Sequence, residues 1–385
     1  MLFINAKIYT MEDEIIENGW LKTTGIFIDS FGSSETAPPT DEEVIDACGG
    51  TLLPGLIDAH THLGMWEDSL GFEGDDGNED TDPATPHLRS IDAINPRDRY
   101  FDDALSAGIT TVVTGPGSAN AIGGIMTAIK TYGNRIDTMI IKDIAIKFAL
   151  GENPKTVYHG KNQAPVTRMA TAAIIREHLI KARKYMEQLE LSKKDEEEDE
   201  PELDFKYEAL IPVLKGELQA HFHAHRADDI FTAIRLANEF NLKLVIVHCT
   251  EGYMIADELK DENVGILYGP FLCDRSKPEL TNQTPKGPGL LYKAGINSCI
   301  ITDHPVVPIQ YLSLCAGLAM KDGLDYNEAL RAITINPAQV LGLDNRIGSI
   351  KKGKDADLVI FDGDPLELKT KVKLVVINGR IVEQL

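Results

Sequence analysis

The chain has 385 residues, of which 43% are hydrophobic and 25% charged, a composition typical of globular proteins that excludes collagen-like, coiled-coil and fully disordered chains. Its formal net charge of −22 argues against nucleic acid as a partner, because phosphate binding needs a basic surface. No run approaches ~18 uncharged apolar residues, so we expect no membrane partner either.

Residues 1–53 are expected to form short strands, with β-prone runs at 2–9 and 20–28 and turns at Pro38-Pro39 and Gly49-Gly50. The first residues lack the basic stretch and apolar core of a secretory signal. The five cysteines are scattered and have no C-x-x-C spacing, as expected of reduced thiols. These features together predict a cytoplasmic protein.

Residues 54–342 alternate β-like apolar runs with helical patterns, which occur at 167–190, 227–240 and 309–321. The β-like runs are Leu56–Ala59, Thr110–Thr114, Thr138–Ile141, Ile144–Phe148, Glu217–Phe222, Lys243–Val247, Val264–Leu267 and Asn297–Thr302. Eight strands alternating with helices predict an α/β fold of the (β/α)8 TIM-barrel type, with a doubly wound sheet as the structural alternative. Neither G-x-G-x-x-G nor G-x-x-x-x-G-K-[ST] is present, so no nucleotide site is indicated.

Much of the negative charge lies in two segments, 67–82 and 195–204, each with eight acidic residues and no basic ones. The second segment has the composition of a solvated surface loop. The first contains Phe72 and several glycines and follows Trp66 closely. Aromatic residues beside carboxylates suit an ordered functional loop as well as a linker.

Residues 343–385 return to a β-like pattern, with apolar runs at 356–361 and 372–377 and a hairpin signal at Asn378-Gly379. Because both ends of the chain are β-rich around a different middle, we expect them to form one small β-sandwich domain together. The expected domains are the two parts of this sandwich, 1–53 and 343–385, and the barrel, 54–342.

Histidines gather at the ends of the predicted barrel strands, where the active site of such a barrel lies. His60 and His62 are two residues apart, so both side chains leave their strand on the face that points to the barrel axis. His221, His223 and His225 share one parity on a later strand in the same way. Two imidazoles on one rigid strand are suited to bind a first-row metal ion.

His248 and Asp303 each follow an apolar run, where burial of a polar side chain is costly unless the group is paired or metal-bound. Together with the two histidine sets above, these residues place a His-x-His pair, two further histidine positions and an aspartate at the ends of four predicted strands. We therefore predict that this set binds a divalent metal ion.

Four stretches of the sequence carry a family resemblance. Residues 53–62, LPGLIDAHTH, resemble the first-strand signature of the amidohydrolase superfamily, and residues 353–360, GKDADLVI, resemble its C-terminal β-domain. Residues 223–229, HAHRADD, and 151–155, GENPK, look like the branch of imidazolonepropionase-related amidohydrolases. The resemblance spans nearly the whole chain and implies a barrel, a β-sandwich formed by both termini, and one or two divalent metal ions.

The resemblance also implies metal ligands by position. The matching residues are His60 and His62 on the first strand, His223 on the fifth, His248 on the sixth and Asp303 on the eighth. His223 matches the first histidine of the family's H-A-H pattern. His221 and His225 stay open as alternatives on the same strand, with His225 nearer to the substrate.

Some members of the family join two metal ions through a carboxylated lysine on the fourth strand, and Lys147 matches that place. A lysine inside an apolar strand has a lowered pKa, and the neutral amine is the form that takes up CO2. The alternative is a lysine that reaches outward or pairs with a carboxylate, in which case we expect a single ion. Zinc is the expected metal, with iron or manganese as alternatives.

The expected activity is hydrolysis of a C–N bond of an amide, cyclic amide or dipeptide by a metal-bound hydroxide. Asp303 is expected to act as the general base toward water and as the general acid toward the leaving nitrogen. A deaminase of a nitrogen heterocycle is the alternative enzyme. A non-catalytic binding protein on a degenerate barrel is the alternative from another class.

Four residues are candidates for binding a small-molecule substrate. His225 lies just beyond the fifth strand, and Glu67 follows the first strand closely enough to line the entrance. Arg226 suits a substrate carboxylate, with pairing to a nearby aspartate as the alternative. His304 follows Asp303 directly, although the strand parity points it away. A homo-oligomer is expected only from the general frequency of two-fold symmetry.

Overall fold

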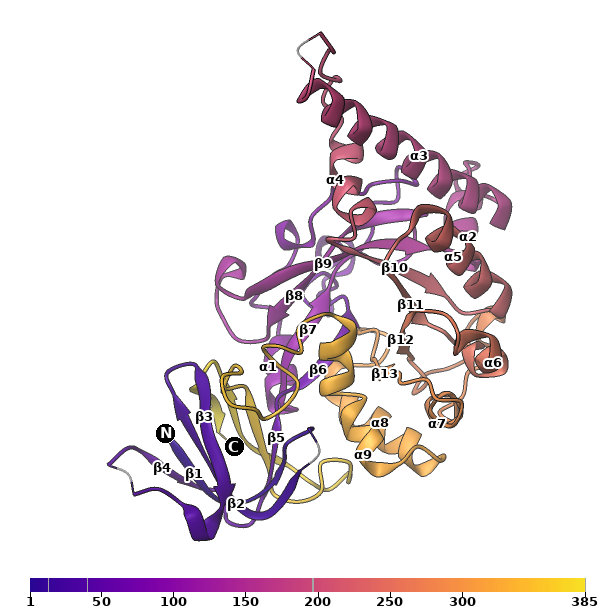
Figure 1. The fold of residues 1–385 in the computed structure, drawn as a ribbon. Helices are drawn as coiled ribbons and strands as arrows, with labels where there is room; N and C mark the ends of the chain where they lie inside the picture. The colour runs from indigo at the N-terminus through magenta and orange to yellow at the C-terminus, as the bar shows by residue number, and fades with distance from the viewer. Residues whose placement is uncertain (13, 40, 196, 385) are drawn as a thin grey trace.

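The computed structural model describes residues 1–12, 14–39, 41–195 and 197–384. This part of the chain forms two eight-stranded sheets, one from the two ends of the chain and one from its middle (Figure 1). None of its helices has the length and apolar character needed to cross a membrane.

The terminal sheet joins the first strands of the chain to the last. Its strands are β1 Leu2–Tyr9, β2 Ile15–Thr24, β3 Phe27–Ser33, β4 Val44–Asp46, β5 Thr51–Pro54, β14 Leu358–Phe361, β15 Val372–Ile377 and β16 Arg380–Gln384. They are ordered β16-β15-β14-β5-β1-β2-β3, with β4 beside β1, so the antiparallel pair β5–β14 connects the two ends. A separate apolar core, which includes Phe3, Leu21 and Val376, holds this sheet together. The expectation that both termini share one β-structure is confirmed.

The middle of the chain forms a barrel-like sheet whose strand order follows the chain. Its strands are β6 Leu56–Thr61, β7 Ile109–Thr114, β8 Ile122–Lys130, β9 Ile140–Ala149, β10 Gln219–Ala224, β11 Leu244–His248, β12 Gly265–Tyr268 and β13 Cys299–Ile300. The first and last strands approach each other where Asp58 Oδ2 accepts hydrogen bonds from Thr302 N at 3.1 Å and Oγ1 at 2.6 Å. The sheet is therefore nearly closed, which confirms the predicted α/β barrel.

The third strand differs from expectation. β8 runs antiparallel to both β7 and β9, and its residues were not expected to form a strand. The expected strands Thr138–Ile141 and Ile144–Phe148 instead contribute to the single strand β9. The physical reason is the short connection 115–121 between β7 and β8, since a parallel return needs a crossover of a dozen or more residues.

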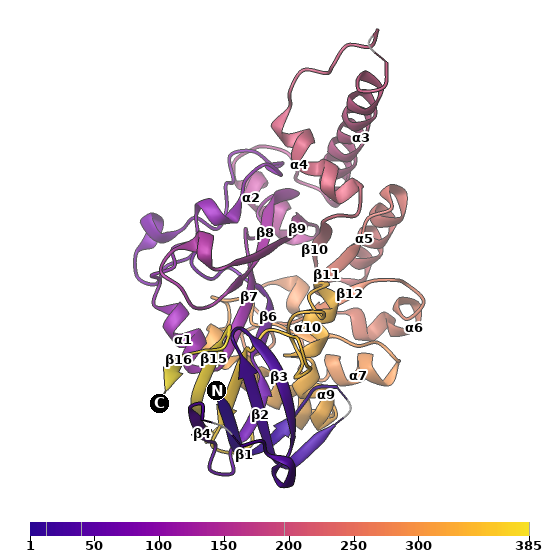
Figure 2. The same cartoon turned by 60° about the vertical axis from the view of Figure 1, so that its left-hand side comes forward.

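Ten α-helices are present in the described ranges. They are α1 Tyr100–Ser106, α2 Glu152–Gly160, α3 Arg168–Ser192, α4 Phe205–Leu214, α5 Ala227–Phe240, α6 Ala256–Leu259, α7 Gly287–Lys293, α8 Leu312–Lys321, α9 Tyr326–Arg331 and α10 Ile335–Val340. The three predicted helical patterns correspond to α3, to α5 and to a 3-10 turn continued by α8. Helices α3 and α4 project from the barrel at the end opposite the terminal sheet (Figures 1 and 2). The acidic segment 195–204, of which residue 196 lies outside the described residues, falls between these two helices in the chain.

The terminal sheet is fastened to the barrel by a buried lysine. Lys130, at the end of β8, forms ion pairs with Asp355, at 3.2 Å, and with Asp357. Arg346 also pairs with Asp355, at 2.8 Å. Because Lys130 and both aspartates are almost completely buried, this pairing ties the stretch before β14 to the barrel wall.

Candidate active site

A cavity of about 620 Å³ lies at the carboxyl ends of the barrel strands. The side chains that line it include His62, Lys147, His223, His225, His248 and Asp303. They come from five different strands or the residues that directly follow them, so the barrel brings together residues that are far apart in the sequence.

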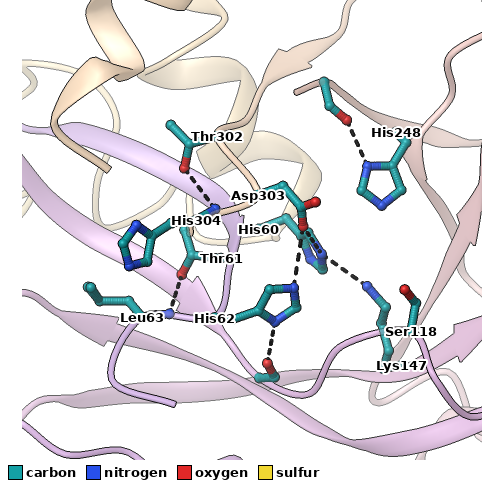
Figure 3. A network of polar contacts seen from close by, with 12 residues as sticks. His60, Thr61, His62, Leu63, Ser118, Lys147, His248, Thr302, Asp303 and His304 are labelled. Carbon is teal, nitrogen blue, oxygen red and sulfur yellow. Dashed lines mark hydrogen bonds and ion pairs between the residues drawn. The ribbon is translucent and has the colours of Figure 1, made fainter. Parts of the chain in front are cut away.

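The first group of side chains consists of His60, His62 and Asp303 (Figure 3). Asp303 Oδ1 lies 3.4 Å from His60 Nε2 and 3.3 Å from His62 Nε2. Nδ1 of His62 is 2.7 Å from the carbonyl oxygen of Gly115, which can only accept, so Nδ1 carries the ring proton. The lone pair on His62 Nε2 then faces a carboxylate oxygen. Two acceptors in this arrangement fit a cation between them.

The second group consists of His223, His225 and His248, whose ligand atoms lie within 4.8 Å of one another. His248 Nδ1 is 2.7 Å from the carbonyl oxygen of Gly269, which leaves Nε2 unprotonated by the same reasoning. Both ring nitrogens of His223 are buried without a hydrogen-bond partner in the described ranges. A buried imidazole that lacks partners is costly, so this group also fits a metal ion.

Residues of both groups have an unusual backbone conformation or an unusual pKa. His248 and Asp303 have φ values of +74° and +53°, in the left-handed region that non-glycine residues rarely adopt and that is enriched at functional sites. Burial lowers the pKa of His248 to about 4 and holds the pKa values of His60 and His223 well below the usual range. The three imidazoles are therefore neutral at neutral pH, which is the form that binds metals.

Lys147 lies on β9 beside the first group. Its Nζ is 3.0 Å from His60 Nε2, and the side chain is almost completely buried (Figure 3). Burial lowers the pKa of this amine to about 7, so a substantial fraction is neutral at neutral pH. This is the chemical state that uptake of CO2 requires.

Of the three histidines on β10 and directly after it, two line the cavity. His223 and His225 line it, and His225 Nδ1 is 2.7 Å from Thr250 Oγ1. His221 lies nearer the start of the strand, and its Nε2 is 2.9 Å from Gln219 Oε1 instead. Three residues of equal parity along one strand and the residue that follows it thus lie at different depths in the barrel.

The other residues predicted to bind substrate lie outside the residues that line the cavity. Arg226 is exposed and pairs with Asp228 at 2.9 Å. Glu67 accepts a hydrogen bond from Asn95 Nδ2 at 2.8 Å, while its neighbour Trp66 packs its ring 4.6 Å from that of His62. His304 packs against Tyr100, with ring centroids 4.4 Å apart, as its strand parity suggested.

Sequence reasoning missed two charged residues after β12. Glu279 Oε1 lies 3.6 Å from His223 Nε2 and 3.7 Å from His225 Nε2. Lys277 lines the cavity and pairs with Glu279 at 2.7 Å. Both residues lie about ten positions beyond their strand, in or next to a 3-10 turn, where no periodicity marks them.

Comparisons with known proteins bear on the family and the fold of this chain. The model of the Amidohydrolase family matches residues 206–382. The solved structure of an amidohydrolase from Thermotoga maritima MSB8 is 40% identical with a TM-score of 0.96, and the match covers 100% of this chain and 99% of that one.

Curated relatives extend the comparison. Amidohydrolase tasK of Hapsidospora irregularis is 31% identical over 89% of this chain, which spans only 37% of that protein's length. A 5-methylthioadenosine/S-adenosylhomocysteine deaminase of Thermoanaerobacter pseudethanolicus is 25% identical over 99% of this chain and 93% of its own length. An imidazolonepropionase of Sphingopyxis alaskensis is 24% identical over 98% of this chain and 95% of its own.

Proposed function

The chain belongs to the amidohydrolase superfamily, and on that basis we propose that it is a metal-dependent hydrolase that cleaves a C–N bond of an amide, cyclic amide or dipeptide. The observation that carries the proposal is the convergence of two groups of buried imidazole and carboxylate ligands on one cavity. In the first group, the unprotonated Nε2 of His62 faces a carboxylate oxygen of Asp303. In the second group, both ring nitrogens of His223 lack a hydrogen-bond partner among the described residues. Both arrangements fit a bound cation.

The residues that would hold the metal are those of the first group together with His223, His248 and Lys147. Zinc fits this nitrogen and oxygen set, and so do iron and manganese. Lys147, with its partly neutral amine, is proposed to be carboxylated and to serve two ions at once. A divalent ion held here would lower the pKa of bound water and polarise the bond under attack.

Asp303 is proposed to move the protons of the reaction. Its carboxylate lines the cavity and would orient the attacking water, accept a proton from it and pass that proton to the leaving nitrogen. General acid–base transfer of this kind is typically worth about 10²–10⁴-fold in rate. The Oδ1 atom of this carboxylate lies within 3.4 Å of Nε2 of both His60 and His62, beside the residues that would hold the metal.

A deaminase is the rival activity, and one of the relatives is called a deaminase. The residue that would favour it is an acid on the loop after β10 that faces the substrate. In the described part of the chain, neither Asp228 nor Asp229 lines the cavity; Asp228 pairs with Arg226 and Asp229 with Arg168. The geometry therefore favours cleavage of an amide.

The proposal is tested by a panel of N-acyl amino acids, dipeptides and cyclic ureides against the metal-loaded protein, with product identification by mass spectrometry. We expect hydrolysis into an acid and an amine for at least one class, abolished when His60→Ala and His62→Ala are combined. Ammonia released from a nitrogen heterocycle would instead establish the deaminase. A folded protein that takes up no metal would favour the non-catalytic binding protein.

A further inference from the structure

Lys277 presents a positive charge to the active-site cavity. Apart from Lys147, it is the only lysine or arginine among the described residues that line the cavity. Its Nζ pairs with Glu279 Oε1 at 2.7 Å, but Glu279 is 2% exposed and lies outside the cavity lining. The side chain of Lys277 is 23% exposed. The positive end of this ion pair, rather than the negative end, therefore faces the cavity.

The carboxylate behind the lysine is itself held in place. Oε2 of Glu279 accepts a hydrogen bond from the backbone N–H of Glu152 at 3.0 Å. Gly151 permits this approach, because a Cβ at that residue would lie 2.8 Å from Oε2. Glu279 is thus fixed to the start of α2, and through its other oxygen it fixes Lys277 at the cavity wall.

A second contact joins the ammonium group to two further cavity residues. Lys277 Nζ donates to Asn153 Oδ1 at 2.8 Å, and Asn153 Nδ2 donates to Ser118 Oγ at 2.7 Å. All three side chains line the cavity. An ammonium group has three protons, and within the described ranges two of them are used, while the Ser118 hydroxyl keeps its own. The carboxylates of Glu152 and Asp274 also line the cavity, but neither forms an ion pair with Lys277 in this part of the chain.

The available donors lie close to the proposed metal centre. Glu279 Oε1, the partner of Lys277, is 3.6 Å from His223 Nε2, so the ammonium group lies near the second group of histidines. In an N-acyl amino acid, only one carbon atom separates the carboxylate from the nitrogen of the amide bond. A small substrate can therefore place its amide at the metal centre and its carboxylate at Lys277.

We propose that Lys277 and Ser118 bind a carboxylate of the substrate, so that the cavity takes N-acyl amino acids or dipeptides with a free carboxyl group rather than neutral cyclic amides. The inference rests on the hydrolase proposed above and narrows its substrate class. An anion suits these donors, because a hydrogen bond between an ammonium group and a carboxylate is stronger than a neutral one. Lys277 thus takes the role that the sequence suggested for Arg226, whose side chain pairs with Asp228 instead.

Substrates that differ only in the carboxylate test the proposal. N-acyl amino acids and dipeptides are assayed beside their carboxamides with the metal-loaded wild type, Lys277→Met and Ser118→Ala. We expect kcat/KM of the wild type to favour the carboxylates at least about tenfold, and Lys277→Met to lose this preference mainly through a higher KM. Ser118→Ala should reduce the preference to a smaller extent. Lys206→Met is the control and should keep it, because Lys206 pairs with Asp82 at 2.6 Å and does not line the cavity.

Lys277→Met alone leaves the buried charge of Glu279 unpaired, so the double variant with Glu279→Gln is compared as well. The double variant keeps the net charge of the wild type, and we expect it to lose the preference too. If Lys277→Met does not fold, the double variant and Ser118→Ala decide. A purely structural role would lower kcat/KM equally for both members of each pair. That result, or a wild type without preference, would overturn the inference while the hydrolase stands.

A wild type that cleaves none of these compounds would contradict the proposed function instead, and calorimetry then judges the subsite separately. We expect the carboxylates to bind at least about tenfold more tightly than the carboxamides, and Lys277→Met to remove the difference. Equal binding of the two by the wild type, or a difference that Lys277→Met leaves unchanged, would overturn the inference on its own.

Discussion

Asp303 is the side chain on which the proposed chemistry most depends, because it lies within 3.4 Å of both His60 and His62 and also faces the cavity. Asp303→Asn keeps the size and one oxygen of the side chain but removes its ability to take a proton. We expect kcat to fall by about 10²–10⁴-fold while the metal content measured by mass spectrometry stays close to wild type. A variant with a near-normal rate would refute the role of Asp303 as base and acid.

The buried amine of Lys147 is expected to react with CO2, since burial lowers its pKa to about 7. The amine is charged below that pH and neutral above it, so carboxylation becomes more favourable as the pH rises through neutrality. We expect metal-free protein supplied with bicarbonate to take up more metal than protein in CO2-free buffer, with the larger difference at about pH 8. Lys147→Met should abolish the bicarbonate effect. Equal uptake with and without bicarbonate would contradict a carboxylated lysine.

Cys249 is a buried thiol next to His248, and burial raises its pKa to about 12. The raised pKa keeps it protonated at about pH 8, and only the thiolate reacts. We expect iodoacetamide to modify the exposed Cys48 in the folded protein and to leave Cys249 intact, as peptide mapping would show. Denatured protein, in which both thiols react, is the control. Rapid modification of Cys249 in the folded protein would indicate a reactive site.

At the scale of elements, β8 shows how a short connection fixes the direction of a strand. Gly124 allows the segment 84–89 to run close alongside this strand, with parallel bridges to it at Ala84 and Arg89, since a Cβ at Gly124 would lie 2.3 Å from the carbonyl oxygen of Leu88. Gly124→Ala should therefore lower the melting temperature, with a cost of about 1–3 kcal/mol. Gly160→Ala is the control, because a Cβ at Gly160 meets nothing within 4 Å. Equal melting temperatures for the two variants would contradict this packing.

The sequence could predict those elements that leave a signal in neighbouring residues, such as an apolar run or a spacing of two. Strand parity and the polar residues that end apolar runs were enough to place His60, His62, His248 and Asp303 at one mouth of a barrel. Strand β8 was not predictable in this way, because Gly123-Gly124 interrupts its apolar pattern. Once the strand is recognised, its antiparallel direction follows from the short connection to β7, so the missing signal was the strand itself and not its direction.

Glu279 illustrates a second limit of sequence reasoning. Its contacts with His223 and with Glu152 join residues more than fifty positions apart, and they exist only because a turn after β12 folds back over the barrel mouth. Arg226 shows the converse, since its position beside the fifth strand suggested substrate binding but its side chain pairs with Asp228 at the surface. Loop side chains therefore need the tertiary structure before they can be assigned.

For the whole molecule, the buried pairing of Lys130 with Asp355 and Asp357 makes the terminal sheet and the barrel depend on each other. Lys130→Met would leave two buried carboxylates without this cation, and such a loss typically costs about 3–5 kcal/mol. We expect a clearly lower melting temperature in calorimetry, partly recovered when Asp357→Asn is added. Lys351→Met is the control, since Lys351 is exposed and its contact with Glu12 is 3.7 Å long. A melting temperature equal to that of the control would show that the pairing does not stabilise the fold.

The measurement that tests the central claim most directly is anomalous diffraction at the zinc edge from crystals of the zinc-loaded protein. The claim is that side chains from distant strands converge on divalent ions at the barrel mouth. It predicts one peak among His60, His62 and Asp303 and a second among His223, His225 and His248. Peaks only elsewhere on the molecule, or no peak in crystals soaked with zinc, would contradict it.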